Sequence, residues 1–201
     1  RMSGHLHLVP HREPRTSHEH VVLQLEGGTD LRFHDPRKFG RLYGVADPAG
    51  ILGHLGPEPL APTFTGNLLV EMLAGRRRQL KPLLLDQGFI AGLGNIYVDE
   101  ALWASGLHPV TLSNTVAADA AKRLHRAIRR VLRRGLRNGG TTLSRGEATF
   151  TSVNGRAGRN RGHLAVFRRT GQPCPRCRTP IARMIVAQRS THFCPQCQKE
   201  A

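Results

Sequence analysis

The chain has 201 residues, and 30 Lys and Arg residues against 14 Asp and Glu residues give it a formal net charge of +16. No apolar run approaches the ~20 residues that a membrane span needs, and no apolar block marks a signal peptide, so we expect a soluble intracellular protein. A chain this basic indicates a polyanionic partner, usually nucleic acid; the alternative is an arginine-rich surface without a specific partner.

The first 45 residues are predicted to form β-structure. Two short runs containing β-branched or aromatic residues, His20–Leu25 and Asp30–Phe33, flank Glu26–Thr29, whose two glycines predict a hairpin turn. Residues 46–66 are rich in Pro and Gly and are expected to connect this part to the rest of the chain.

From Asn67 onward the apolar residues take helical spacing. Two helices separated by Gly75 account for the first group of apolar positions, which comprises Leu68, Leu69, Met72, Leu73, Leu80, Leu83 and Leu84. Pro82 fits the first turn of the second helix or kinks it. A third helix is predicted over Ile96–Ser105, opened by Gly94-Asn95 and closed by Gly106.

The longest helix candidate runs over Val116–Asn138, with Ala, Leu and Ile on one face and Arg and Lys on the opposite face. Residues 144–162 show almost no apolar pattern, and we expect a mobile loop there. Leu164–Phe167 is expected to form a short strand, and a cysteine module begins at Gly171.

The four cysteines form two C-x2-C pairs, Cys174/Cys177 and Cys194/Cys197, separated by sixteen residues. This spacing predicts one zinc ion held by four thiolates, and four protein ligands leave no open position, so the zinc is expected to be structural. The alternatives are two disulfides or four unrelated thiols, which an intracellular protein disfavours. His192 could compete as a ligand.

The insert between the pairs is expected to form a hairpin with strands Ile181–Ala187 and Thr191–Phe193 and the tip Gln188–Ser190. A cation at the tip, Arg189, is well placed to enter a DNA groove, and the alternative is a solvated turn arginine.

Several blocks along the chain resemble the formamidopyrimidine-DNA glycosylase family, which includes the endonuclease VIII type. The matching blocks, in chain order, are Met2–Gly4, His34–Gly40, Leu55–Leu60, Leu84–Gln87, Gly92–Tyr97, Gly139–Thr142, Gly171–Cys174 and Gln188–Cys194. They span nearly the whole chain and end in the matching zinc module. The Gly94–Tyr97 and Arg37–Phe39 blocks look more like the formamidopyrimidine branch than endonuclease VIII.

The resemblance implies an α+β fold in three parts. These are a partial N-terminal β-sandwich at residues 1–62, a helix–two-turn–helix domain at 63–162 with a lesion-recognition loop at 144–162, and a β-ribbon zinc finger at 163–201. It also implies an enzyme of base excision repair, a DNA glycosylase with abasic-site lyase activity on oxidised purines. The implied partner is damaged or abasic double-stranded DNA, with no membrane, and the protein is expected to be a cytoplasmic, nucleoid-associated monomer.

The resemblance also assigns residues. Met2, Arg37 and Phe39 would fill the gap left by an everted nucleotide, which offsets part of the cost of unstacking a base. Without the resemblance, Met2 and Phe39 would be interpreted as core residues.

Further DNA contacts are implied for residues nearer the helical region. Asn95 would grip a backbone phosphate at a helix N-terminus. His18, with His20 as a close competitor, and Arg76 match positions that contact DNA, and Lys81, in a block typical of the family, is a further implied DNA contact. Arg189 would contact phosphate and donate a proton in the second strand-cleavage step.

Three departures from the family pattern follow. The family begins with a Pro-Glu pair whose proline amine attacks the sugar C1′, as lysine amines do in imine-forming enzymes, whereas this chain starts at Arg1-Met2. We therefore expect the nucleophile to be absent, as in a truncated product, a misplaced start codon or a fragment. Arg178 replaces the usual Gly, which would strain the knuckle if that position needs a positive φ, and Phe167–Arg169 replaces a Tyr-Gly-Arg block.

Two other functions stay open on the sequence alone. A non-catalytic damaged-DNA-binding module would retain the helix–two-turn–helix motif and the zinc ribbon. A zinc-ribbon protein that binds RNA or the ribosome is compatible with the charge, but the collinear blocks oppose it.

Overall fold

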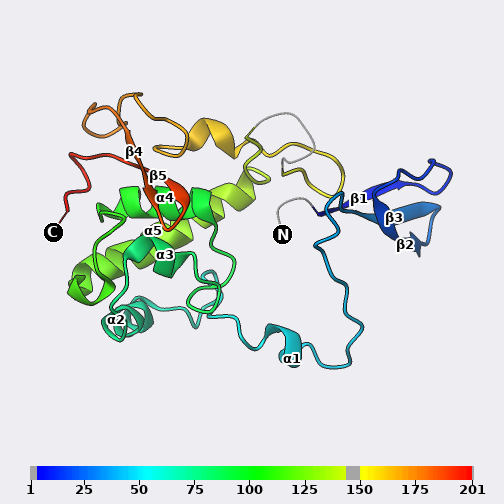
Figure 1. The fold of residues 1–201 in the computed structure, drawn as a ribbon, viewed down its shortest axis with the longest axis horizontal. Coiled ribbons are helices and arrows are strands. Elements are labelled where there is room, and N and C mark those ends of the chain that lie inside the picture. The colour runs from blue at the N-terminus through cyan, green and yellow to red at the C-terminus, as the bar shows by residue number, and fades with distance from the viewer. Residues whose placement is uncertain (1–3, 144–149, 201) are drawn as a thin grey trace. The chain divides into compact units, whose positions relative to one another are not determined.

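The computed structural model describes residues 4–143 and 150–200. The chain forms two compact units, Arg1–Asp47 with Gly135–Gly162, and Pro48–Arg134 with His163–Ala201. Three strands belong to the first unit, and the helical core and a two-stranded ribbon belong to the second (Figure 1). This mixture of helices and small separate sheets is the predicted α+β architecture.

The first unit contains an antiparallel sheet of β1 (His5–Pro10), β2 (Glu19–Leu25) and β3 (Thr29–His34) in the order β1-β3-β2. The turn between β2 and β3 is the predicted one, and Gly27 and Gly28 both have positive φ there, a conformation that glycine adopts without steric cost. β1 lies within the first 45 residues, which were predicted to form β-structure, but no strand with these bounds was predicted.

The two faces of this sheet differ in chemistry. Leu6, Leu8, Val21, Leu23, Leu25, Leu31 and Phe33 share one face by register. This apolar face is not well covered, because three of its leucines, Leu6, Leu23 and Leu25, are 42–50% exposed. The opposite face is polar, yet it buries Asp30 and Arg32 almost completely.

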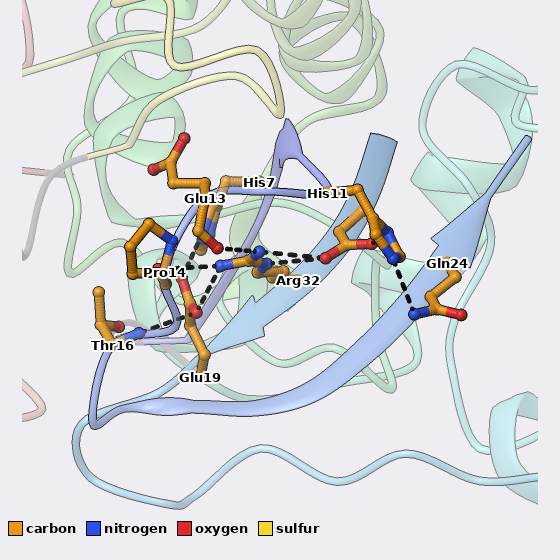
Figure 2. A network of polar contacts seen from close by, with 9 residues as sticks. His7, His11, Glu13, Pro14, Thr16, Glu19, Gln24 and Arg32 are labelled. Atoms are coloured by element: carbon orange, nitrogen blue, oxygen red, sulfur yellow. Dashed lines mark hydrogen bonds and ion pairs between the residues drawn. The ribbon is translucent and has the colours of Figure 1, made fainter. Parts of the chain in front are cut away.

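A hydrogen-bonded network explains how the polar face buries charge (Figure 2). The Arg32 guanidinium donates to Asp30, to Glu19 and to the backbone carbonyls of Glu13 and Pro14 at 2.7–3.2 Å. His7 and His11 bond the same two carboxylates at 2.9 and 2.7 Å. Every charge in the network therefore has an opposite charge or a dipole as a partner, which buried charges require.

The second unit is built on helices. They are α1 (Ala49–Leu52), α2 (Gly66–Ala74), α3 (Leu80–Leu84), α4 (Asn95–Ser105) and α5 (Ala118–Arg137), and the last extends three residues into the first unit. The predicted helices are confirmed to within about two residues at their ends, and only α1 falls in the expected connector.

Local signals explain where these helices begin and end. The Thr65 hydroxyl accepts from Leu68 N at 3.1 Å and caps α2. α4 ends at Gly106, whose φ of 75° is the left-handed cap that glycine favours. The helices bury one shared core, which includes Leu69, Leu73, Leu80, Leu83, Leu84, Leu93, Val98, Leu102, Leu124, Ile128 and Val131.

The C-terminal ribbon consists of β4 (Ala182–Val186) and β5 (Arg189–Phe193), and it packs beside α4 (Figure 1). The predicted tip, Gln188–Ser190, was wrong: Ala187 and Gln188 alone form the turn, with φ of 46° and 61°, and Arg189 and Ser190 both belong to β5. Two positive φ values make a tight two-residue turn that matches strand twist, so Arg189 becomes the first residue of β5.

The predicted strand over Leu164–Phe167 was also wrong. The backbone N–H groups of Ala165, Val166 and Phe167 all converge on the Glu100 carboxylate at 2.8–3.0 Å. Successive N–H groups can meet one anion only if the backbone curves around it, which excludes an extended strand.

The expected loop at 144–162 is partly described. Residues 144–149 lie outside the described residues, and residues 150–162 contain a turn in which Ser152 N donates to Arg156 O at 2.9 Å. A short 3-10 helix follows at Asn160–His163.

Candidate nucleic-acid interface

The four cysteines come together as the spacing predicts. Their Sγ atoms all lie within 4.8 Å of one another. Cys177 and Cys194 are 3.4 Å apart and Cys174 and Cys197 are 4.0 Å apart, close to the ~3.8 Å that tetrahedral zinc–thiolate bonds of ~2.3 Å require. The donor set and its geometry fit one structural Zn2+.

The protein environment of the thiols favours a bound cation. Hydrogen bonds from Thr179 lower the pKa of Cys177 to about 6, whereas burial raises the pKa of Cys197 to about 12. Four thiolates this close repel one another unless a metal ion lies between them, so Zn2+ supplies the charge that lets all four ionise. Trp103 Nε1 donates to Cys174 Sγ at 3.4 Å and helps to fix that ligand.

His192 is not a competing ligand. Its backbone N–H and its ring Nδ1 lie 2.8 and 3.1 Å from Asp99 Oδ2, so its ring contacts α4. The imidazole is buried there, which leaves the cysteines as the metal ligands among the described residues.

Two arginines adopt backbone conformations that favour glycine. Arg178 has φ of 69° immediately after the second cysteine, which bears out the expected strain at that position. Arg168, within the Phe167–Arg169 block, has φ of 57°. Both positions lie in the left-handed region, where a side chain costs energy.

Three predicted site residues meet where the ribbon joins the helices. The Ser190 carbonyl accepts from Lys81 Nζ at 2.9 Å and from Asn95 Nδ2 at 3.2 Å. Arg189 is the neighbour of Ser190 in β5 and is exposed. Asn95 begins α4, and the preceding Gly94 provides no capping side chain for the first turn. The arrangement presents an exposed guanidinium beside a helix N-terminus, a combination that suits an anion.

Asp99 holds this joint together from inside α4. Its two carboxylate oxygens accept from Lys81 Nζ at 2.5 Å and from His192 N at 2.8 Å, and Asp99 and Lys81 are both fully buried. Burial lowers the pKa of Lys81, the nearby Arg189 charge lowers it further, and Asp99 opposes both effects. Sequence reasoning did not single out Asp99, and we refer to Lys81, Asn95, Asp99, Arg189 and Ser190 as the α4–ribbon joint.

Glu100 makes a second connection. Its carboxylate is 1% exposed and receives the N–H groups of residues 165–167 together with a 3.5 Å contact from Arg134. Sequence reasoning missed Glu100 as well. The available signal was an adjacent acidic pair inside a helix with apolar neighbours, in a chain where acids are scarce.

In the first unit, the loop after β3 displays two predicted residues. The Asp35 carboxylate accepts from Gly40 N at 2.7 Å and from Arg37 N at 3.3 Å and so closes the loop on itself. The Arg37 guanidinium lies 5.2 Å from the centroid of the Phe39 ring, and Phe39 is 50% exposed. Phe39 is therefore not a core residue.

Gly40 is required in this loop for space. A Cβ atom there would lie 2.3 Å from the Phe33 ring. Asp35, which sequence reasoning did not single out, and Gly40 together fix the position of the exposed pair.

The remaining predicted residues have different surroundings. The ring of His20 bonds the Asp35 carbonyl at 3.0 Å, whereas the exposed His18 packs edge-on against His34 at 5.7 Å. Arg76 is exposed and donates to Gly75 O at 3.2 Å, with no hydrogen bond to the α4–ribbon joint among the described residues. Met2 lies outside the described residues. His18, Arg37 and Phe39 belong to the first unit, and Arg76, Lys81, Asn95 and Arg189 to the second.

No helix in the described part of the chain is long and apolar enough to cross a membrane. A four-thiolate ribbon packed on a helix whose N-terminus carries Asn95, in a strongly basic chain, defines a zinc-finger nucleic-acid-binding protein.

Comparisons with known proteins identify the family. Residues 1–42 match the formamidopyrimidine-DNA glycosylase N-terminal domain, 55–146 the formamidopyrimidine-DNA glycosylase H2TH domain, and 171–199 the zinc finger found in FPG and IleRS. The formamidopyrimidine-DNA glycosylase of Protochlamydia amoebophila is 48% identical over 200 residues, which cover 100% of this chain and 72% of the relative.

Solved structures agree with this assignment. The MutM (Fpg) protein of Thermus thermophilus has a TM-score of 0.88 at 44% identity, over 100% of this chain and 74% of that protein. The Lactococcus lactis Fpg bound to DNA containing an abasic site has a TM-score of 0.88 at 34% identity, over 100% of this chain and 73% of that protein. The chain belongs to the formamidopyrimidine-DNA glycosylase family.

Proposed function

We propose that this protein acts in base excision repair as a DNA glycosylase with abasic-site lyase activity on oxidised purines, and that it binds damaged duplex DNA and everts the lesion. The observation that carries the proposal is the α4–ribbon joint, in a chain that aligns over nearly its whole length with relatives named formamidopyrimidine-DNA glycosylase. We also propose that the protein is a cytoplasmic, nucleoid-associated monomer. Its proposed domains are residues 1–62, 63–162 and 163–201.

The α4–ribbon joint is proposed to bind one backbone phosphate. Asn95 and the first turn of α4 offer N–H donors, and the exposed Arg189 offers a bidentate cation. Lys81 is fully buried, so we propose that it acts indirectly, by holding the Ser190 carbonyl and thereby the direction of Arg189.

The exposed loop of the first unit is proposed to enter the duplex. Inserting an apolar ring and a cation into the gap left by an everted base offsets part of the few kcal/mol that unstacking costs. Arg37 and Phe39 already contact each other and are held by Asp35, which favours this role. Met2, His18 and Arg76 are proposed as further DNA contacts, and residues 144–162 as the lesion loop.

Catalysis is proposed to use Arg189 as the proton donor of the second strand-cleavage step. Borohydride trapping on abasic duplex separates binding from imine chemistry: the proposed lyase activity predicts a covalent adduct, and a non-catalytic DNA-binding module predicts binding without one. An adduct would show that an amine within these residues serves as the nucleophile.

The joint is tested by Asn95→Ala, with Asn67→Ala on the exposed side of α2 as the matched control. We expect Asn95→Ala to weaken binding to an abasic duplex about tenfold or more, because a hydrogen bond to a charged group contributes ~1.5–3 kcal/mol. Fluorescence anisotropy at fixed salt measures the dissociation constants. Equal affinities for the two variants would contradict the assignment.

A further inference from the structure

α5 carries a row of arginines that the proposed lesion site does not use. Arg123, Arg126, Arg130 and Arg133 are all exposed, and their spacing of three, four and three residues places them on one side of the helix. We call these four residues the α5 arginine row. Another side of the same helix packs Leu124, Ile128 and Val131 into the core.

The row has no partner within the described part of the chain. None of its guanidiniums makes a hydrogen bond or ion pair to residues 4–143 or 150–200. Neighbouring arginines of the same helix behave differently: Arg129 donates to the carbonyls of Pro59 and Ala61, and Arg134 contacts Glu100.

The charges of the row also lack compensation within α5. Asp119 in the first turn is the only acidic residue of this twenty-residue helix. Like charges three and four residues apart repel each other along a helix, so the isolated helix is destabilised. A polyanion lying along the row would relieve this repulsion.

The row makes no hydrogen bond to the α4–ribbon joint within the described residues. α3 and α4 bury their apolar side chains in the same core as α5, and α4 contacts β5. Because α5 faces that core with its apolar side, the arginine row lies on the side of α5 opposite the core, whereas Arg134 beside the row reaches Glu100 of α4.

The geometry of the row fits a nucleic-acid backbone. Arg123 to Arg133 spans ten residues, about 15 Å of helix at ~1.5 Å per residue. One strand of duplex DNA carries a phosphate about every 3.4 Å along the axis, so the row covers roughly four phosphates. The row contains no large apolar side chain, whereas protein interfaces are centred on aromatic and apolar anchors.

We propose that the α5 arginine row binds the phosphate backbone of a second duplex DNA segment, independently of sequence and damage, while the lesion site holds the first. Such a second contact lets the protein transfer between DNA segments during its search for damage. This proposal goes beyond lesion recognition and stands or falls separately from it.

The experiment saturates the protein with a short abasic-site duplex and then titrates a labelled undamaged duplex at several salt concentrations. Anisotropy is expected to show a second binding event whose log affinity falls with log salt at a slope of about −3.6, for roughly four neutralised phosphates. The variant R123Q/R126Q/R130Q/R133Q is expected to weaken this event more than ~10-fold and to leave abasic-duplex binding within ~2-fold.

Two control variants isolate the cause. The first changes four dispersed exposed cations, Arg12, Arg15, Arg41 and Lys199, to Gln and lowers the net charge from +16 to +12, as the row variant does (16 − 4 = 12). It is expected to retain the second event. Replacing the row with four lysines keeps its charge, so that variant is also expected to retain the event, whereas the retained abasic-duplex binding of the glutamine variant excludes misfolding as the cause of its loss.

The proposal is overturned if wild-type protein shows no second event, or if the dispersed variant loses as much as the row variant. It is also overturned if the lysine variant loses the event. The lesion proposal fails in a different way, namely if the protein binds abasic and undamaged duplexes with equal affinity. In that case the same variants test the row on undamaged duplex alone.

Discussion

Arg178 has a left-handed backbone conformation, which glycine adopts more readily than any residue with a side chain. Its φ of 69° lies just after Cys177, within a knuckle whose shape the metal ligands fix. A left-handed conformation costs an L-residue ~1–2 kcal/mol, and glycine avoids this cost. The sequence predicted this strain conditionally, because the resemblance supplied the glycine but only the structure supplies the φ.

Arg178→Gly is therefore expected to stabilise the protein. The gain is about 1 kcal/mol or less, because the relieved strain is partly offset by the ~0.4–1 kcal/mol that a more flexible unfolded chain costs. Chemical unfolding of the zinc-loaded protein measures it. Arg15→Gly, at an exposed position without positive φ, serves as the control and is expected to give no gain. A loss of stability in Arg178→Gly would refute the strain.

Asp99 is the residue on which the α4–ribbon joint depends. Asp99→Asn removes the counter-charge of the buried Lys81 and is expected to destabilise the protein by ~3–5 kcal/mol, as breaking buried ion pairs does. The double variant Lys81→Met with Asp99→Asn removes both charges and is expected to recover much of that loss. Urea unfolding measures both variants. If the double variant lost as much stability as Asp99→Asn alone, or more, the two charges would not be coupled.

At the scale of elements, the polar face of the β1-β3-β2 sheet makes this unit sensitive to acid. Burial alone would raise the pKa values of Glu19 and Asp30. Hydrogen bonds from Thr16, His7 and Arg32 to Glu19, and from His11 and Arg32 to Asp30, bring both below their ordinary values of 4.5 and 3.8. Carboxylates with lowered folded-state pKa values contribute stability that is present above the ordinary values and lost as the pH falls through the folded-state values.

We expect the sheet to unfold as the pH falls below about 4, and Asp30→Asn to lose stability at neutral pH and to flatten the acid transition. Circular dichroism between pH 7 and pH 2 measures the transition. An acid transition unchanged by Asp30→Asn would contradict the role of the network.

The elements differ in how far the sequence predicted them. α4 and α5 follow from apolar spacing and glycine ends, and β2 and β3 from their flanking turn, because these are local signals. Residues 164–167 were mispredicted because their conformation is imposed by Glu100, more than sixty residues away. The turn at Ala187-Gln188 lacks the usual glycine or asparagine, so nothing local marked it.

The residues of the candidate site also differ in how far the sequence predicted them. The cysteine ligands follow from spacing alone, and the resemblance supplied Asn95, Lys81 and Arg189. The Ser190 carbonyl that brings these three together, and the Asp99 that supports it, depend on contacts between distant segments, which no local pattern encodes.

For the molecule as a whole, two properties bear on its function: its net charge and the share of its relatives' length that it spans. The net charge of +16 suits a long polyanion, and the apolar sheet face of the first unit leaves Leu6, Leu23 and Leu25 42–50% exposed. The chain aligns with 72% of the length of its relative from Protochlamydia amoebophila.

We propose that the zinc ribbon and the start of α4 together form a site for damaged DNA. The most direct test is the ratio of dissociation constants for an undamaged and an abasic duplex of the same sequence, measured with zinc-loaded protein at moderate salt. We predict a preference for the abasic duplex of at least ~10-fold, which corresponds to about 1.4 kcal/mol, and its loss when a chelator removes the zinc. Equal affinity for the two duplexes, or a preference that survives removal of the metal, would contradict the account.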